Sequence, residues 1–187
     1  IESIVKILNH SDEDDSHAEE NDGWRREKKY TYPALHRLAK DVITFPQIIQ
    51  RIDQILDKYG KIRDNATPEL LQIRRELAKT EGSISRTLYS ILRSAQSEGV
   101  VEKDVTPTLR DGRLVIPVIP TLKKKIKGIV HDESATGKTV FIEPTEVVEA
   151  NNRVRELEGE ERKEIIRILT NFTNKVRPYV REMMDSY

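Results

Sequence analysis

The 187-residue sequence contains no cysteine and few aromatic residues. Without cysteine the chain forms no disulfide and offers no thiolate to a metal ion, which fits the reducing cytoplasm. No apolar run approaches the roughly 20 residues that a membrane-spanning helix requires, so we expect no contact with a membrane. The sequence opens on Ile1 inside one helical pattern and ends on Tyr187 inside another. We therefore expect it to be a piece of a longer protein.

The sequence also lacks an excess of either charge, since 32 basic residues balance 32 acidic ones. Any nucleic-acid site must then be a local patch, because the whole chain has no net positive field. Charged residues make up 34% of the sequence and hydrophobic residues only 36%. A composition this polar, with regular apolar spacing, favours long helices that are exposed on most sides. The predicted fold class is mainly α.

Residues 1–66 are predicted to form a helical core segment. Apolar residues recur at spacings of three and four in residues 1–9 and again from Trp24 to about Gly60. We expect Pro46 at the first turn of a helix and Gly60 as a C-cap. Between the helical stretches, residues 11–23 carry seven acidic residues and no lysine or arginine. We interpret residues 10–23 as a disordered acidic loop, in preference to a metal site that uses His10 and His17.

Two longer helical patterns follow, at residues 67–99 and 144–187. The first begins with a strong signal, because Thr67 can cap a helix and Pro68 suits its first position. Both patterns have a narrow apolar row typical of paired helices. We expect Pro144 in the first turn of the second helix, and a kink or break at Pro178.

The intervening residues 100–143 change to short β-branched runs, which predict a small antiparallel sheet. Its best hairpin signal is the Asp111-Gly112 pair. The expected strands are 105–109, 114–119, 126–130 and 139–142. Two long helices joined by a compact sheet bury each other's apolar rows if they pair antiparallel. We therefore predict two antiparallel lever helices that carry the sheet, a clamp-like tip, at their far end.

No motif in the sequence supports catalysis, a cofactor or a metal ion. The Thr136–Thr139 segment resembles the end of a phosphate-binding loop, but the upstream glycine is missing and a strand follows in place of a helix. His131, Asp132 and Glu133 are potential ligands, yet neighbouring residues of a strand point to opposite sides. We interpret them as structural or solvent-facing.

Positive charge is concentrated in the tip. Residues 110–127 contain six basic residues against the single acid Asp111. Exposed cations without interleaved aromatics suit contact with phosphates and not with bases. The alternative, a solvated lysine run that protects strand edges, remains open. The predicted nucleic-acid-binding residues are Arg110, Arg113, Lys123, Lys124, Lys125, Lys127 and Lys138.

Several segments of the sequence resemble the bacterial MutS-II family, the MutS paralogues that lack a mismatch-reading domain. The similarity covers about residues 24–187. The acidic loop departs from the family as an insertion, and Thr136 stands where serine is usual. The segments that carry the resemblance are Thr67–Leu70, Arg110–Arg113, Gly128–Gly137, Thr139–Pro144 and Val147–Asn152.

The resemblance implies that the chain is the core and lever region with a reduced clamp, and that it is not itself an enzyme. It further implies that an ATPase domain using ATP and Mg²⁺, often with an Smr-type endonuclease domain, follows in a cytoplasmic homodimer. The family is linked to binding branched DNA in recombination suppression, and in some bacteria to rescuing stalled ribosomes. The two hypotheses are therefore a DNA-contacting clamp and a structural arm that docks on the ribosome, its rRNA or a protein.

Overall fold

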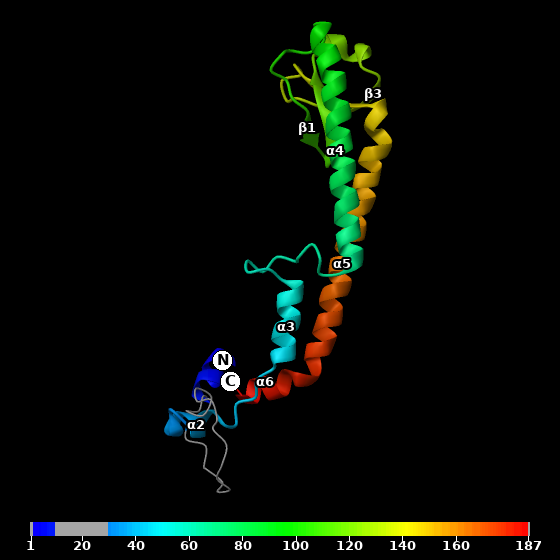
Figure 1. The fold of residues 1–187 in the computed structure, drawn as a ribbon. Helices are drawn as coiled ribbons and strands as arrows, with labels where there is room; N and C mark the ends of the chain where they lie inside the picture. Colours follow the sequence, from blue (N-terminus) through cyan, green and yellow to red (C-terminus); the bar gives the residue numbers. More distant parts are fainter. Residues whose placement is uncertain (1, 10–29, 187) are drawn as a thin grey trace, which may run out of the picture. The chain divides into compact units, whose positions relative to one another are not determined.

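The computed structural model describes residues 2–9 and 30–186 (Figure 1). The predicted acidic loop at residues 10–23 lies outside the described residues. The chain divides into two compact units. One unit combines the chain up to Arg63 with the chain from Leu169 onward, and the other runs from Asp64 to Ile168.

The first unit is helical. Proline begins two of its helices, at Pro33 and Pro46, and the prediction for Pro46 is confirmed. Pro178 lies in a short 3-10 helix that separates α5 from α6, so the predicted break is also confirmed. The helices are α1 (Glu2–Leu8), α2 (Pro33–Ala39), α3 (Pro46–Ile55), the end of α5 (Val148–Val176), η3 (Arg177–Tyr179) and α6 (Val180–Ser186).

Gly60 is not the C-cap that its position in the sequence predicts. Helix α3 already ends at Ile55, and Leu56 is extended and bridges to Ile62. Gly60 instead has a φ of +76° in a turn where its N–H donates to the carbonyl oxygen of Asp57. The glycine signal for a left-handed backbone was correct, but it marked a tight turn and not a helix end.

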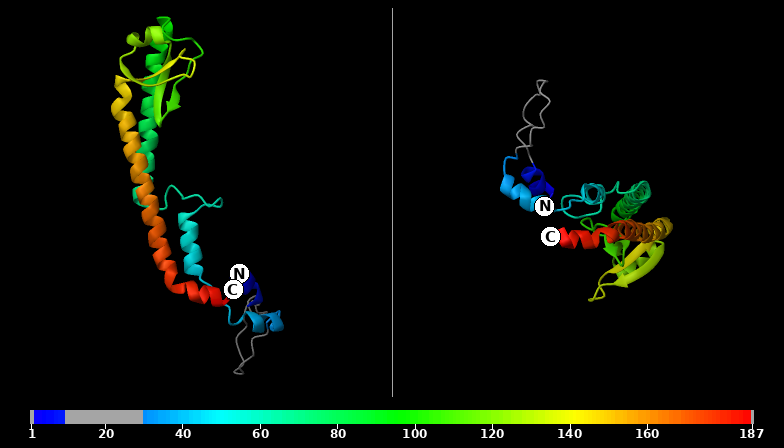
Figure 2. Two further views of the ribbon diagram at one scale, coloured as in Figure 1. Left: turned by 180° about the vertical axis from the view of Figure 1, so that it is seen from behind. Right: turned by 90° about the horizontal axis from the view of Figure 1, so that it is seen from below.

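Two long helices run antiparallel in the second unit. Thr67 caps α4 (Pro68–Ser97), with its hydroxyl oxygen accepting a hydrogen bond from the N–H of Leu70. Residues that come later along α4 contact residues that come earlier along α5, so the two helices are antiparallel. Figures 1 and 2 show the two helices side by side. The contacts join Thr67 to Glu164, Arg74 to Glu161 and Glu76 to Arg153.

Pro144 is not in the first turn of α5, as its sequence context predicts. It is the last residue of a strand, and a 3-10 turn, η2 (Thr145–Val147), comes before the helix. Pro144 belongs to β4 (Val140–Pro144) because it pairs with Gly128 of β3 (Gly128–Glu133) in the antiparallel ladder. The stretch predicted as one helix, residues 144–187, therefore contains four helical elements after Pro144: η2, α5, η3 and α6.

A four-stranded antiparallel sheet lies between α4 and α5 in the sequence, in the order β1-β2-β4-β3. Asp111 and Gly112 both have positive φ and form the turn that joins β1 to β2, which confirms the predicted hairpin. The element bounds are β1 (Thr108–Arg110), β2 (Arg113–Val118), η1 (Pro120–Lys125), β3 (Gly128–Glu133) and β4 (Val140–Pro144).

The core of this unit fills the space between the sheet and the second half of α4. Alternate residues of β4, Val140 and Ile142, belong to it, so Phe141 and Glu143 lie on the opposite face of the sheet. The sheet and the two helices thus share one core. The boundaries predicted near residues 99 and 143 separate helix from sheet and do not separate two cores. The other members include Ile84, Leu88, Leu92, Ile116, Val118, Val147 and Val154.

Candidate nucleic-acid interface

Four lysines form the strongest positive feature of the tip, and we call them the lysine cluster. Lys123, Lys124 and Lys125 lie on η1, and Lys127 lies between η1 and β3. All four side chains are exposed. Within the part of the chain that the structure describes, none of the four forms a salt bridge. Their charges therefore face solvent without an acidic partner there.

One side of the lysine cluster borders a groove beside α4. Lys125 and Lys127 line it together with Ser90 and Ser94 of the helix. The groove has a volume of about 370 Å³. Two carboxylates, Glu98 and Glu146, also line it. Because these acids lower the positive potential inside the groove, phosphates are better attracted to the outer face of η1.

Arg110 remains exposed at the end of β1, beside the Asp111-Gly112 turn. Its guanidinium carbon lies 4.2 Å from the centre of the Phe141 ring. A cation over an aromatic face is attracted by the ring's negative face while its charge stays available to solvent. The contact positions Arg110 without neutralising it.

Arg113 is held inside the fold, unlike the lysines. Its Nη1 donates to Oε1 of Glu143 at 2.7 Å, and its Nη2 donates to Oδ1 of Asn152 at 2.6 Å. The side chain is only 14% exposed. This geometry makes Arg113 the charge partner of a buried carboxylate.

Glu143 is the centre of a buried polar network that the sequence analysis did not identify. It has no solvent exposure, and His131, Asn151 and Arg113 all donate hydrogen bonds to its carboxylate. Burial raises the pKa of Glu143, but the three hydrogen bonds together lower it by more than burial raises it. The net pKa of Glu143 therefore lies below the ordinary value of 4.5. In the sequence, the one feature that indicates this network is a single acidic residue, Glu143, directly after the apolar residues of β4.

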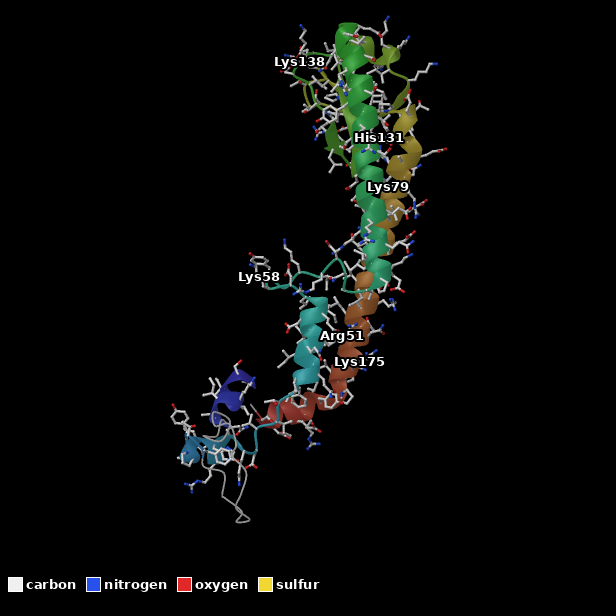
Figure 3. All side chains as sticks on the ribbon, viewed as in Figure 1. Arg51, Lys58, Lys79, His131, Lys138 and Lys175 are labelled. Atoms are coloured by element: carbon white, nitrogen blue, oxygen red, sulfur yellow. The ribbon has the colours of Figure 1, made fainter. Side chains whose placement is uncertain are left out.

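A bulge in β3 brings His131 to this network. The strand pairing shifts between Val130 and Asp132, so His131 is the extra residue. Bulges re-aim a side chain in this way. The structural interpretation of His131 agrees with its hydrogen bond to Glu143. Figure 3 shows His131 in the middle of the tip, away from the turn that carries Lys138.

Lys138 lies apart from the two arginines. It belongs to the turn between β3 and β4, which lies beside the Val118 end of β2, whereas Arg110 and Arg113 flank the turn at the other end of that strand. Gly137 has a φ of +68° and donates its N–H to the carbonyl oxygen of Ser134. A strand follows this turn, as predicted, so the segment lacks the helix of a phosphate-binding loop.

The described residues contain no cluster of three or more potential metal-ligating side chains. None of the helices in residues 2–9 and 30–186 is both long and apolar enough to cross a bilayer. The predicted absence of catalytic and cofactor residues remains a prediction.

No protein-family model matches this chain. Sequence comparison nevertheless finds clear relatives that carry the name Endonuclease MutS2. The chain is 41% identical over 158 residues to one from Levilactobacillus brevis, covering 84% of this chain and 20% of the relative. It is 36% identical over 160 residues to one from Geobacillus sp. strain WCH70, covering 86% and 20%. One from Enterococcus faecalis is 35% identical over 157 residues, covering 84% and 20%.

The similarity supports a relationship to MutS2 proteins, in agreement with the predicted resemblance. The chain spans about a fifth of the length of the curated relatives it matches.

Proposed function

We propose that this chain is the lever and clamp part of a MutS2-type protein and that its tip binds DNA through backbone phosphates. In this proposal α4 and α5 are the lever helices, and the sheet with η1 is the clamp. In this proposal the chain itself contributes no catalytic residue. ATP hydrolysis with Mg²⁺, nuclease activity, dimerisation and residence in the cytoplasm belong to the proposed whole protein.

The lysine cluster is the observation that supports the proposal best. Four exposed lysines within five positions, unpaired in the described structure, match the chemistry of phosphate contact. Base readout has little support in the tip. Its only aromatic residue, Phe141, is buried and covered by Arg110. We therefore expect binding that depends on salt and ignores sequence.

The test measures the affinity of the 187-residue chain for duplex DNA and for a four-way junction across salt concentrations. With about four phosphates engaged on duplex DNA, the logarithm of the affinity should fall with the logarithm of salt with a slope of about −3.6. Replacing Lys123, Lys124, Lys125 and Lys127 with glutamine should remove most of the affinity and flatten the slope.

A matched control replaces four exposed lysines outside the tip, Lys58, Lys79, Lys163 and Lys175, with glutamine. Figure 3 shows Lys79 on α4 below the sheet. The control has the same net charge as the test variant, so it separates a local contact from a general charge effect. Equal DNA affinity and equal slope in both variants would contradict the proposal. Both variants are also titrated with ribosomes, and loss of ribosome binding alone in the test variant would favour the ribosome-docking alternative.

A further inference from the structure

Strand β3 ends the sheet on one side and is unusually open to solvent. Five of its six residues are exposed, and His131 is the exception. At its centre two large apolar side chains, Ile129 and Val130, are 49% and 50% exposed. The opposite edge, β1, has only three residues. Short edges are poor templates for another strand, whereas β3 is long enough to pair.

The free edge of β3 also presents backbone groups. The backbone carbonyl of Lys127 accepts a hydrogen bond from the N–H of Thr145, so the backbone polar groups of Lys127 point toward β4. In an antiparallel ladder these groups alternate in direction from one residue to the next. The N–H and C=O of Ile129 therefore also point toward β4, and those of Gly128 and Val130 point away from it. In the described part of the chain no further strand lies beyond β3. Addition of a strand would satisfy these groups.

The two ends of this edge carry opposite charges, and this arrangement indicates which strand could pair with it. Lys125 and Lys127 precede the apolar centre, and Asp132 and Glu133 follow it. A second β3 in antiparallel orientation would place its acidic end opposite this basic end, and its basic end opposite this acidic end. A parallel copy would place like charges together. DNA does not fit the whole edge, because the two acids repel phosphate.

We propose that β3 of one chain pairs antiparallel with β3 of a second copy, related by a two-fold axis near Ile129 and Val130. The contact is self-complementary, as two-fold symmetry requires. It covers part of the exposed Ile129 and Val130 side chains, one on each face of the sheet, and extends the sheet across both tips. This inference goes beyond the proposed function, since it requires neither nucleic acid nor an ATPase domain.

Sedimentation velocity of the 187-residue chain, freed of nucleic acid, tests the pairing. A concentration-dependent dimer is expected. Two charge-reversal variants, K125E/K127E and D132K/E133K, place like charges at both ends of the pairing. Each should raise the dimer dissociation constant about tenfold or more, because several surface attractions become repulsions.

Mixing the two reversed variants provides the decisive measurement. One then has an entirely acidic edge and the other an entirely basic edge, so an antiparallel heterodimer regains attraction at both ends. We expect the mixture to dimerise at least as strongly as the unmodified chain. A DNA contact or a dimer formed elsewhere predicts no such recovery. A monomeric unmodified chain, or two variants that dimerise normally by themselves, would overturn the proposal.

Val130→Pro gives a second test that does not depend on charge. The N–H of Val130 points away from β4, so proline should block strand addition while the ladder with β4 persists. Circular dichroism verifies the fold, and dimerisation should be lost. A folded Val130→Pro variant that still dimerises would also overturn the proposal.

Discussion

At the scale of single residues, the buried Glu143 carboxylate is a charge that the fold must compensate. A buried charge is tolerated only when it is paired and hydrogen-bonded, and Arg113, His131 and Asn151 meet this need. Because the pKa of Glu143 is lowered in the folded state, its ionised form stabilises the fold above the unfolded value of 4.5. That stabilisation is lost as the pH falls below 4.5 toward the folded pKa.

Glu143→Gln should destabilise the fold at pH 7 by about 3–5 kcal/mol, because Arg113 then lies beside an uncharged amide. The difference between the original and variant chains should shrink as the pH falls below 4.5, since glutamine does not titrate. Urea unfolding across this range measures both effects. Glu149→Gln, at an exposed position on α5, is the control and should change stability little. A difference that stays constant with pH would contradict the role of the ionised carboxylate.

Gly128 is a second residue that the fold constrains, through a close approach of two strands. A Cβ atom at this position would lie 2.1 Å from the carbonyl oxygen of Glu143 and 2.9 Å from Cγ2 of Ile142. Gly128→Ala should therefore force β3 away from β4, at a cost of about 1–3 kcal/mol. Thermal unfolding by circular dichroism measures the loss.

Gly159→Ala is the matched control for this prediction. Gly159 lies inside α5, and a Cβ there would meet no atom within 4 Å. Alanine should stabilise the helix by about 0.5–1 kcal/mol. Two alanines with effects of the same sign would argue against the steric explanation.

At the scale of elements, α4 and α5 combine a buried apolar row with polar contacts between the helices. The Arg153–Glu76 ion pair is well exposed, so it contributes little. Thr67 contributes more, because its hydroxyl serves both helices. It accepts from the N–H of Leu70 at 3.1 Å and donates to Oε1 of Glu164 at 2.7 Å. The start of α4 is thereby linked to α5.

Thr67→Ala should destabilise the helix pair by about 1–2 kcal/mol, because it removes the cap and leaves the largely buried Glu164 one donor short. Thr67→Ser keeps the hydroxyl and should recover most of the stability. Chemical denaturation monitored by helical circular dichroism provides the measurement. Equal losses for alanine and serine would show that the methyl group, and not the hydroxyl, stabilises the contact.

At the scale of the whole molecule, the chain consists of two units with different packing. The unit from Asp64 to Ile168 contains the entire core cluster of sheet and helices. In the first unit, an open apolar groove of about 350 Å³ is lined by Ile48, Ile52, Phe172 and Met183, among others. A unit with its own core is expected to fold without its neighbour.

A chain of residues 64–168 should therefore unfold cooperatively, with a midpoint within a few degrees of a transition seen in the 187-residue chain. The complementary residues, 1–63 and 169–187, leave more apolar surface open and should be less cooperative. Differential scanning calorimetry distinguishes these outcomes. A noncooperative, molten 64–168 chain would show that the sheet and long helices depend on the first unit.

The sequence by itself determined the features that depend on a residue's own backbone. Asp111-Gly112 specifies a hairpin because both positions need positive φ, and Thr67-Pro68 begins a helix because of its cap and its missing N–H. Pro178 breaks α5 for the same local reason. The regular apolar rows also predicted the long helices, and the short β-branched runs predicted the small sheet between them.

Only the tertiary structure decided which charges are free and which are buried. The sequence groups Arg113 with the surface lysines, yet strand pairing places it beside Glu143, thirty residues away in the chain. The local sequence around Pro144 suits a helix start, but pairing with Gly128 places Pro144 in β4. Likewise, strand register separates Lys138 from the arginines. Local spacing contains no information on such contacts, because they form only when distant strands pair and exclude water from the groups between them.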